Sequence, residues 1–199
     1  MKRCPPRGPK AMPSFSAVLL AGGKSTRMGR DKALLPVVGT GELLWQRQLR
    51  VLNELQPKEL FWSGPVREGM PAHVHVVADV VPDAGPLAGI SACLGAMRSD
   101  LLIVLAVDLP QMTSVYLSRV LGLCSTDCGM VAKHGDFYEP LAAVYPKMIS
   151  CLADEHLRDG RNALQDFVSA GLQRRLMESF ELEPEDGILF KNVNRPEDL

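Results

Sequence analysis

The sequence predicts an α/β protein with a Rossmann-like, doubly wound and mostly parallel sheet that carries helices on both faces. Short apolar runs alternate along the chain with longer segments whose apolar residues recur at helical spacing. The length of 199 residues suits one sizeable core and is too short for two comfortable domains. Sheets of this kind bind ligands outside the carboxyl ends of their strands.

The apolar pattern assigns each element in order. Strands are predicted at 17–20, 59–62, 74–77 and 101–106, with two late strands at 176–180 and 188–192. Helices are predicted at 43–55, 87–97, 114–123, 148–158 and 162–170. Gly160 separates the last two helices, and Gly171 is expected to end the second.

Residues 1–16 differ from the rest, and we expect them to form a disordered, basic and proline-rich leader. Their prolines forbid a continuous amphipathic helix, and they lack the apolar region of a secretory signal. No linker divides residues 17–199, which are expected to form a single domain.

Charge and cysteine usage exclude several classes of partner and site. The formal net charge is −1, and no apolar run is long enough to cross a bilayer, so neither nucleic acid nor membrane is an expected partner. Five scattered cysteines without an export signal indicate reduced thiols and a cytoplasmic location. Cys124, Cys128 and His134 fall short of the four ligands of a structural zinc site, which favours ordinary packing.

A glycine-rich segment after the first predicted strand is the strongest chemical signal. Gly22 and Gly23 suit close backbone approach to phosphates, and Arg27 and Lys32 can neutralise their charge. The segment is not a P-loop, because Val18 stands where that pattern needs glycine. It also lacks the spaced glycines of the dinucleotide fingerprint. On composition alone, an ordinary turn with exposed cations remains an equal alternative.

Asp108 is the strongest candidate outside this segment. It follows the most hydrophobic predicted strand, and Pro110 prevents that strand from continuing. A carboxylate beside a triphosphate can hold Mg²⁺, which prefers oxygen ligands and keeps water and phosphate oxygens. An aspartate that merely satisfies a turn is the competing interpretation.

The string LLAGGKSTRMGRDKALL resembles the signature of nucleoside triphosphate transferases, in the nucleotide-diphospho-sugar transferase-like superfamily. It is most similar to that of the molybdenum cofactor guanylyltransferases. Further segments match in the same order: 83–90, 107–110, 139–141 and 192–198. The resemblance implies transfer of GMP from GTP to the phosphate of molybdopterin with release of pyrophosphate. It also implies Mg²⁺, with Mn²⁺ as a substitute.

The resemblance assigns roles residue by residue. The implied catalytic residues are Arg27, Lys32 and Asp108, of which Asp108 holds the metal. The implied nucleotide-binding residues are Leu20, Ala21, Gly22, Gly23, Lys32, Ser63, Asp79, Gly85 and Asp108. Ser63 stands where the family tends to have asparagine, and a hydroxyl cannot offer two donors, so recognition there departs from the pattern. For Asp79 and Gly85, a plain turn or helix start would need the same residue types.

The resemblance also divides the domain between two substrates. Residues 17–110 would bind the nucleotide and residues 111–199 the pterin, through Arg161, Asn192 and Asn194. A solvated arginine and turn-forming asparagines are the alternatives at these positions. Other proteins of cofactor biosynthesis or molybdoenzyme maturation are further candidate partners.

Two other functions compete with guanylyl transfer. One is a nucleotidyltransferase that uses CTP on the same pterin, or that acts on another phosphorylated metabolite. The other is a nucleotide-binding regulatory module without turnover. The presence together of Arg27, Lys32 and Asp108 argues against the second.

Overall fold

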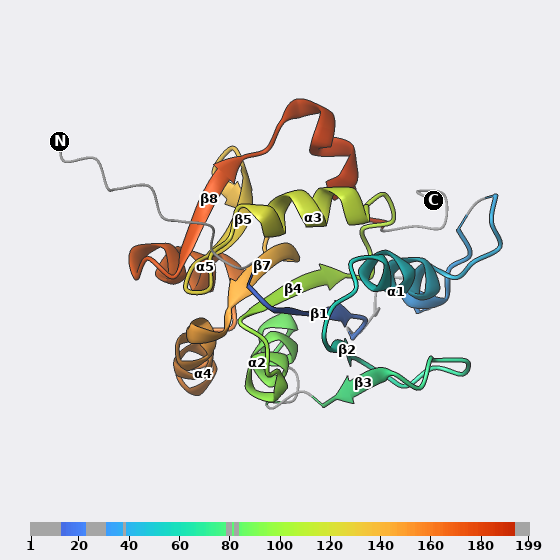
Figure 1. Cartoon of the computed structure of the whole chain (residues 1–199), viewed down its shortest axis with the longest axis horizontal. Coiled ribbons are helices and arrows are strands. Elements are labelled where there is room, and N and C mark those ends of the chain that lie inside the picture. Colours follow the sequence, from blue (N-terminus) through green and yellow to red (C-terminus); the bar gives the residue numbers. More distant parts are fainter. Residues whose placement is uncertain (1–12, 23–30, 38, 79–80, 82–83, 194–199) are drawn as a thin grey trace.

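The structure is a computed structural model that describes residues 13–22, 31–37, 39–78, 81 and 84–193. These residues form one eight-stranded sheet in the order β3-β2-β1-β4-β7-β5-β6, with β8 beside β5 (Figure 1). The expected α/β class with a mostly parallel sheet is confirmed for the part of the chain that leads to the site.

The parallel part of the sheet contains the four early strands. They are β1 (Phe15–Leu20), β2 (Leu60–Ser63), β3 (Val74–Val77) and β4 (Leu101–Ala106). β1 pairs in parallel with both β2 and β4, and β2 pairs in parallel with β3. All residues of β4 are buried, as expected for a strand covered on both faces.

The later strands add an antiparallel extension. They are β5 (Gly129–His134), β6 (Phe137–Tyr138), β7 (Ala142–Pro146) and β8 (Met177–Glu181). β7 pairs antiparallel with β4 and with β5, whereas β8 pairs parallel with β5. The sequence analysis missed β5, β6 and β7. β5 and β6 contain only short apolar runs, and β7 combines two alanines with a terminal proline, residue types that are depleted in strands.

Helices cover both faces of the sheet, as predicted. They are α1 (Leu44–Glu54), α2 (Pro86–Ala96), α3 (Ser114–Gly122), α4 (Ser150–Arg158) and α5 (Leu164–Gln173). The 3-10 helices are η1 (Lys32–Leu34), η2 (Lys147–Ile149) and η3 (Pro184–Phe190). No helix among the described residues is long and apolar enough to cross a bilayer.

Two cores lie on opposite faces of the sheet. Leu19 joins the core under α1 and α3, while its neighbour Val18 joins the core under α2, α4 and α5. Figure 1 shows α3 on one side of β4 and both α2 and α4 on the other. Alternation along a strand therefore supplies both cores from the same apolar run.

Two expectations for the C-terminal part were wrong. Residues 188–192 form no strand; η3 ends at Phe190, whose ring packs edge-on against Tyr116 of α3, 5.4 Å away. Gly171 lies within α5 and does not end it. It packs closely against Ile149, from which an added Cβ would lie 3.1 Å. The left-handed turn falls instead on Arg175, with φ of 58°.

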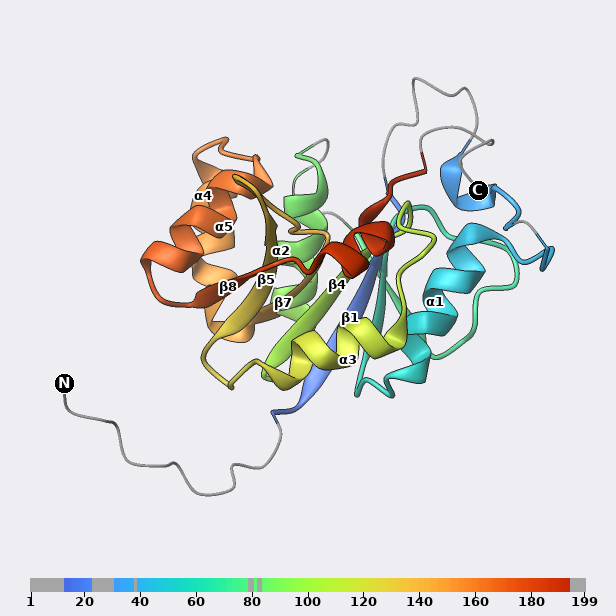
Figure 2. The same ribbon diagram turned by 90° about the horizontal axis from the view of Figure 1, so that it is seen from above.

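The strand order places a switch point between β1 and β4. The chain proceeds from β1 to β2 and β3 on one side, then returns to build β4 on the other. Open sheets of this type bind ligands at such a point, outside the carboxyl ends of the strands. Figure 2 shows the ends of β1 and β4 at the same edge as the start of α2.

Candidate active site

A cavity of about 220 Å³ opens at the carboxyl ends of β1 and β4. Leu20 and Ala106 are partners in the parallel pairing, and the Leu20 carbonyl accepts from the Val107 amide at 3.0 Å. The cavity is lined by residues 20–22, 31–33 and 106–108 together with Pro86 and Leu141. Five residues assigned from the sequence thus line one cavity: Leu20, Ala21, Gly22, Lys32 and Asp108.

The backbone after β1 passes close to the end of β2. Gly64 has φ of 148°, and an added Cβ there would lie 2.7 Å from both the Ala21 carbon and the Gly22 nitrogen. The Ala21 amide also donates to the Ser63 carbonyl at 2.8 Å. Gly64 therefore permits the contact that holds the start of the glycine-rich segment at the cavity.

Lys32 begins η1, and Asp31 is the residue that caps this helix. The Asp31 carboxylate accepts from the Ala33 amide at 3.0 Å and forms an ion pair with Arg67. Lys32 Nζ lies 3.7 Å from Asp108 Oδ2, with about a quarter of each side chain exposed. Lys32 and Asp108 lie far apart in the sequence, and the structure brings their side chains together.

Three successive carbonyls of the loop that carries Asp108 accept hydrogen bonds from other parts of the chain. The Asp108 carbonyl accepts from the Val193 amide at 3.0 Å, and the Leu109 carbonyl accepts from the buried Gln48 side chain. Arg47 Nε donates to the Pro110 carbonyl at 2.5 Å. Because α1 and the C-terminal segment both donate hydrogen bonds to this loop, the position of Asp108 relative to the sheet is fixed.

Helix α2 directs its N-terminus towards the same edge. Gly85 is its N-cap with φ of 72°, a conformation that favours glycine, and Pro86 at the first turn lines the cavity. The partial positive charge of a helix N-terminus attracts anions. Gly85 thus lies beside the cavity, where its nucleotide-binding role stays a prediction.

Ser63 lies at the end of β2 but does not line the cavity. Its side chain is packed under α2, where an added Cβ on Gly89 would come within 2.4 Å of the Ser63 hydroxyl oxygen. Only 5% of Ser63 is exposed. The structure thus gives Ser63 a packing role next to the site, and direct contact with a nucleotide remains a prediction.

The residues assigned to the pterin lie in two separate places. Asn192 is exposed and precedes Val193, whose amide donates to the Asp108 carbonyl, so Asn192 adjoins the cavity at the ends of β1 and β4. Arg161 follows α4 and pairs with Glu155 at 3.3 Å and Asp159 at 2.8 Å. Because Arg161 is already paired with these two acids, less of its positive charge is available to attract a phosphate.

Several assigned residues lie outside the described part of the chain. They are Gly23, Arg27, Asp79 and Asn194, together with residues 1–12 of the predicted leader. Their roles remain predictions from the resemblance.

The described residues do not gather into a ligand set for a protein-only metal centre. No group of three or more His, Cys, Asp or Glu side chains among them could hold an ion. The Asp108 carboxylate at the cavity nevertheless fits Mg²⁺, which is commonly held by one or two carboxylates, substrate phosphates and water. Burial raises the pKa of the Cys124 thiol to about 12, and Cys124 packs against the core under α1 and α3.

A larger cavity of about 600 Å³ lies along α1, away from these residues. Trp45 and Leu49 line it, and its charged residues Glu42 and Arg50 are already paired with each other at 3.1 Å. It contains none of the residues assigned from the sequence. The smaller cavity is therefore the candidate active site.

Sequence reasoning missed Arg67, Arg47 and Gln48. Each acts on the site from another element through one contact, and none belongs to a recognisable local motif. Gln48 carried one usable signal, since a polar residue between the apolar positions of a buried helix face needs a partner.

Comparison with known proteins agrees with this geometry. A family model described as the MobA-like NTP transferase domain matches residues 17–176. A probable molybdenum cofactor guanylyltransferase of Opitutus terrae is 39% identical over 190 residues, with 93% of each chain covered. A molybdenum cofactor guanylyltransferase of Pseudomonas putida is 31% identical over 193 residues, covering 95% of this chain and 97% of the relative.

The fold also matches solved structures. The crystal structure of molybdopterin-guanine dinucleotide biosynthesis protein A from Archaeoglobus fulgidus superposes with a TM-score of 0.70. The match covers 92% of this chain and 94% of that chain at 22% identity, which shows a common fold. Together with the family model and the sequence relatives, it shows that the chain belongs to the family of MobA-like NTP transferase domains.

Proposed function

We propose that this protein is a molybdenum cofactor guanylyltransferase. A phosphate of molybdopterin would attack the α-phosphorus of GTP, and pyrophosphate would leave. The observation that carries the proposal is the meeting of Lys32 and Asp108 in one cavity at the switch point of the sheet. The names of the curated relatives support the choice of substrates.

The residues of the cavity suit the charge changes of this reaction. Nucleotidyl transfer needs mainly positioning of the reactants and stabilisation of developing charge, so no side-chain nucleophile is required. Backbone amides of the glycine-rich segment and Arg27 would bind the triphosphate. Lys32 would offset the negative charge that develops on the departing pyrophosphate.

Asp108 would hold Mg²⁺, with Mn²⁺ as a substitute. When bound there, the ion would supply positive charge and polarise a phosphate oxygen. The carboxylate itself contributes a fixed position, because the carbonyls of its loop are bonded to α1 and to Val193.

The pterin would approach from the side of the C-terminal segment, where Asn192 adjoins the Asp108 loop. Two substrates held by two parts of the chain would meet over the cavity, which is how proximity contributes to rate. The cytoplasm is the proposed location, because Cys124, Cys128 and Cys151 form no disulfide bond in the described part of the chain.

The decisive experiment measures pyrophosphate release with molybdopterin and each nucleoside triphosphate in turn, with and without Mg²⁺. We expect release with GTP and Mg²⁺ only. Preference for CTP would make the protein a cytidylyltransferase. Binding of GTP without any turnover would indicate a regulatory module and contradict the proposal.

A further inference from the structure

The nucleotide cavity contains two carboxylates, which is an unexpected lining for a site that receives a triphosphate. Asp31 and Asp108 both line it, together with the ammonium group of Lys32. About a third of the Asp31 side chain is exposed. A carboxylate that faces phosphate oxygens without a counter-charge repels them, and low dielectric at a partly buried site strengthens the repulsion. Asp31 therefore needs a positively charged partner that stays paired with it when the substrate binds.

Arg67 supplies that cation from the connection between β2 and β3. Its guanidinium pairs with Asp31 Oδ2, while Asp31 Oδ1 caps η1 by accepting from Ala33. Only 14% of the Arg67 side chain is exposed, and it is not among the residues that line the cavity. The guanidinium thus contacts Asp31 from outside the cavity and is not placed to contact a bound ligand.

The backbone around Arg67 is fixed, so the pair is organised in advance. The Trp62 indole donates to the Pro65 carbonyl at 3.0 Å, and the Met70 amide donates to the Arg67 carbonyl at 3.3 Å. Trp62 is fully buried against Trp45, which ties this connection to the core. Arg67 therefore loses little conformational freedom when it holds Asp31.

We propose that Arg67 is a positioning residue for nucleotide binding. By neutralising Asp31 and fixing the cap of η1, it leaves the Lys32 ammonium directed at Asp108 and at the incoming triphosphate. The inference rests on the proposed function, because it concerns the same cavity. It adds a residue from outside the glycine-rich segment that sets the charge of the site.

The test compares GTP and Mg²⁺ binding by calorimetry across a double-mutant cycle. Arg67→Met leaves Asp31 as an uncompensated carboxylate, and we expect the Kd for GTP to rise about tenfold. Asp31→Asn with Arg67→Met removes the repulsion while asparagine still caps the helix, so affinity should return to within about threefold of the wild type. Arg67→Lys should lie between the wild type and Arg67→Met.

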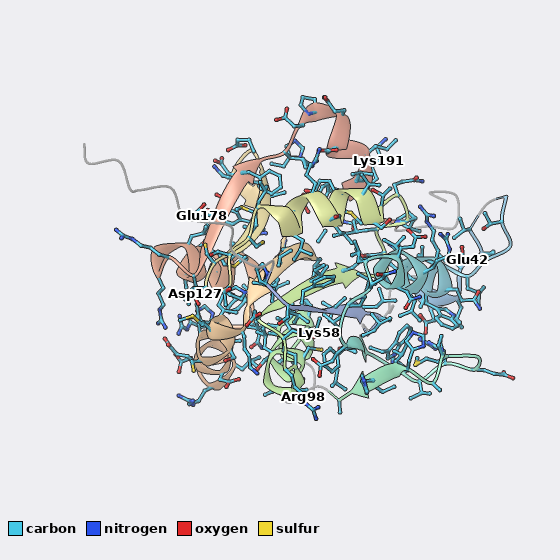
Figure 3. All side chains as sticks on the ribbon, in the orientation of Figure 1. Glu42, Lys58, Arg98, Asp127, Glu178 and Lys191 are labelled. Atoms are coloured by element: carbon cyan, nitrogen blue, oxygen red, sulfur yellow. The ribbon has the colours of Figure 1, made fainter. Side chains whose placement is uncertain are left out.

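Arg98→Met is the matched control, because Arg98 is an exposed arginine beyond the C-terminal end of α2 (Figure 3). It should bind GTP like the wild type. Should Arg67→Met fail to fold, the comparison passes to the double variant and Asp31→Asn alone. If Arg67 acts only through Asp31, these two should share the same affinity.

Three results would overturn the inference. Arg67→Met could bind GTP as tightly as the folded wild type, or the double variant could be no better than Arg67→Met. Affinity of the double variant far below that of Asp31→Asn would show that Arg67 contacts the nucleotide itself. A wild type that binds no GTP would instead contradict the proposed function, and the inference with it.

Discussion

The two halves of the domain reach the cavity in different ways. In residues 17–110, parallel strands end at one edge, so the side chains that follow β1 and β4 arrive together. In residues 111–199, the added strand β7 is antiparallel to both β4 and β5, and the site is reached by a returning segment after β8. Figure 2 shows this segment running from β8 past α3 to the edge where β1 and β4 end.

Different forces hold the two contributions in place. Asp108 sits on a loop gripped by backbone and side-chain donors. The returning segment is held against α3, where Arg119 pairs with Asp186 and Phe190 packs on Tyr116. The comparison indicates that the sheet positions the contribution of residues 17–110 to the cavity, whereas packing on a helix positions that of residues 111–199.

The largest expected effect is in the nucleotide half, at Asp108. Asp108→Asn keeps the shape of the side chain but removes the charge that favours Mg²⁺, so transfer should fall by about a thousandfold. Steady-state pyrophosphate release checks this, with circular dichroism to show that the fold is intact. Pterin affinity should not change. Near-normal turnover by a folded variant would refute the metal role.

The second-largest loss of transfer rate is expected for Lys32. Lys32→Ala removes a preorganised charge near the leaving group and should slow transfer about a hundredfold. Lys24→Ala and Arg30→Ala are the controls from the same segment, and we expect much smaller losses there. Single-turnover rates at saturating GTP measure the three variants. Equal and small losses at all three positions would reduce the segment to a nonspecific basic patch.

The second half is tested by the asparagines. Asn192→Ala combined with Asn194→Ala removes polar groups implied to bind the pterin, and should weaken molybdopterin binding about thirtyfold. GTP affinity should stay nearly unchanged, because the main-chain bond from Val193 to Asp108 is retained. Calorimetric titration with each substrate separates the two effects. Loss of GTP affinity with intact pterin binding would reverse the assignment of the halves.

The smallest effect concerns the half-buried Glu139, between β6 and β7. Burial raises the pKa of its carboxyl, while the charge of His134 partly opposes the shift. An acid whose pKa is higher in the folded state costs stability once the pH exceeds the unfolded value, and the cost is complete above the folded value. Glu139→Gln should therefore stabilise the fold at neutral pH.

We expect a gain of about 0.5 kcal/mol, because solvent still screens a half-buried carboxylate. Denaturant unfolding at pH 7 and below pH 4 measures it, and the difference should vanish at the lower pH. A gain that is the same at both pH values would point to packing rather than charge.

Sequence reasoning succeeded best where burial leaves a strong local signal. The bounds predicted for β3 and β4 match those in the structure. β4 is a continuous apolar run, which is typical of a buried strand, whereas β3 was found through its valines, which favour strands although only Val74 is buried. It failed for β5, whose short apolar run ends at Lys133, and for β7, which begins with two alanines and ends with proline, residue types that are depleted in strands. It also failed for η3, because packing on α3 decides the course of that segment.

For the site, the sequence by itself predicted which groups lie at one edge of the sheet. The order of apolar runs determined a sheet with a common edge, and the residue types after those runs determined which groups meet there: backbone amides, Lys32 and Asp108. These follow from local sequence, because a strand end and the loop after it are neighbours along the chain.

Only the tertiary structure decided what holds these groups in place. The pairing of Arg67 with Asp31 and the grip of Gln48 on the Asp108 loop join residues that are 36 and 61 positions apart. The bond from Val193 brings the C-terminal segment to the same loop. Contacts of this range leave no periodic trace in a sequence, because any residue with a suitable donor can serve once the backbone brings it near.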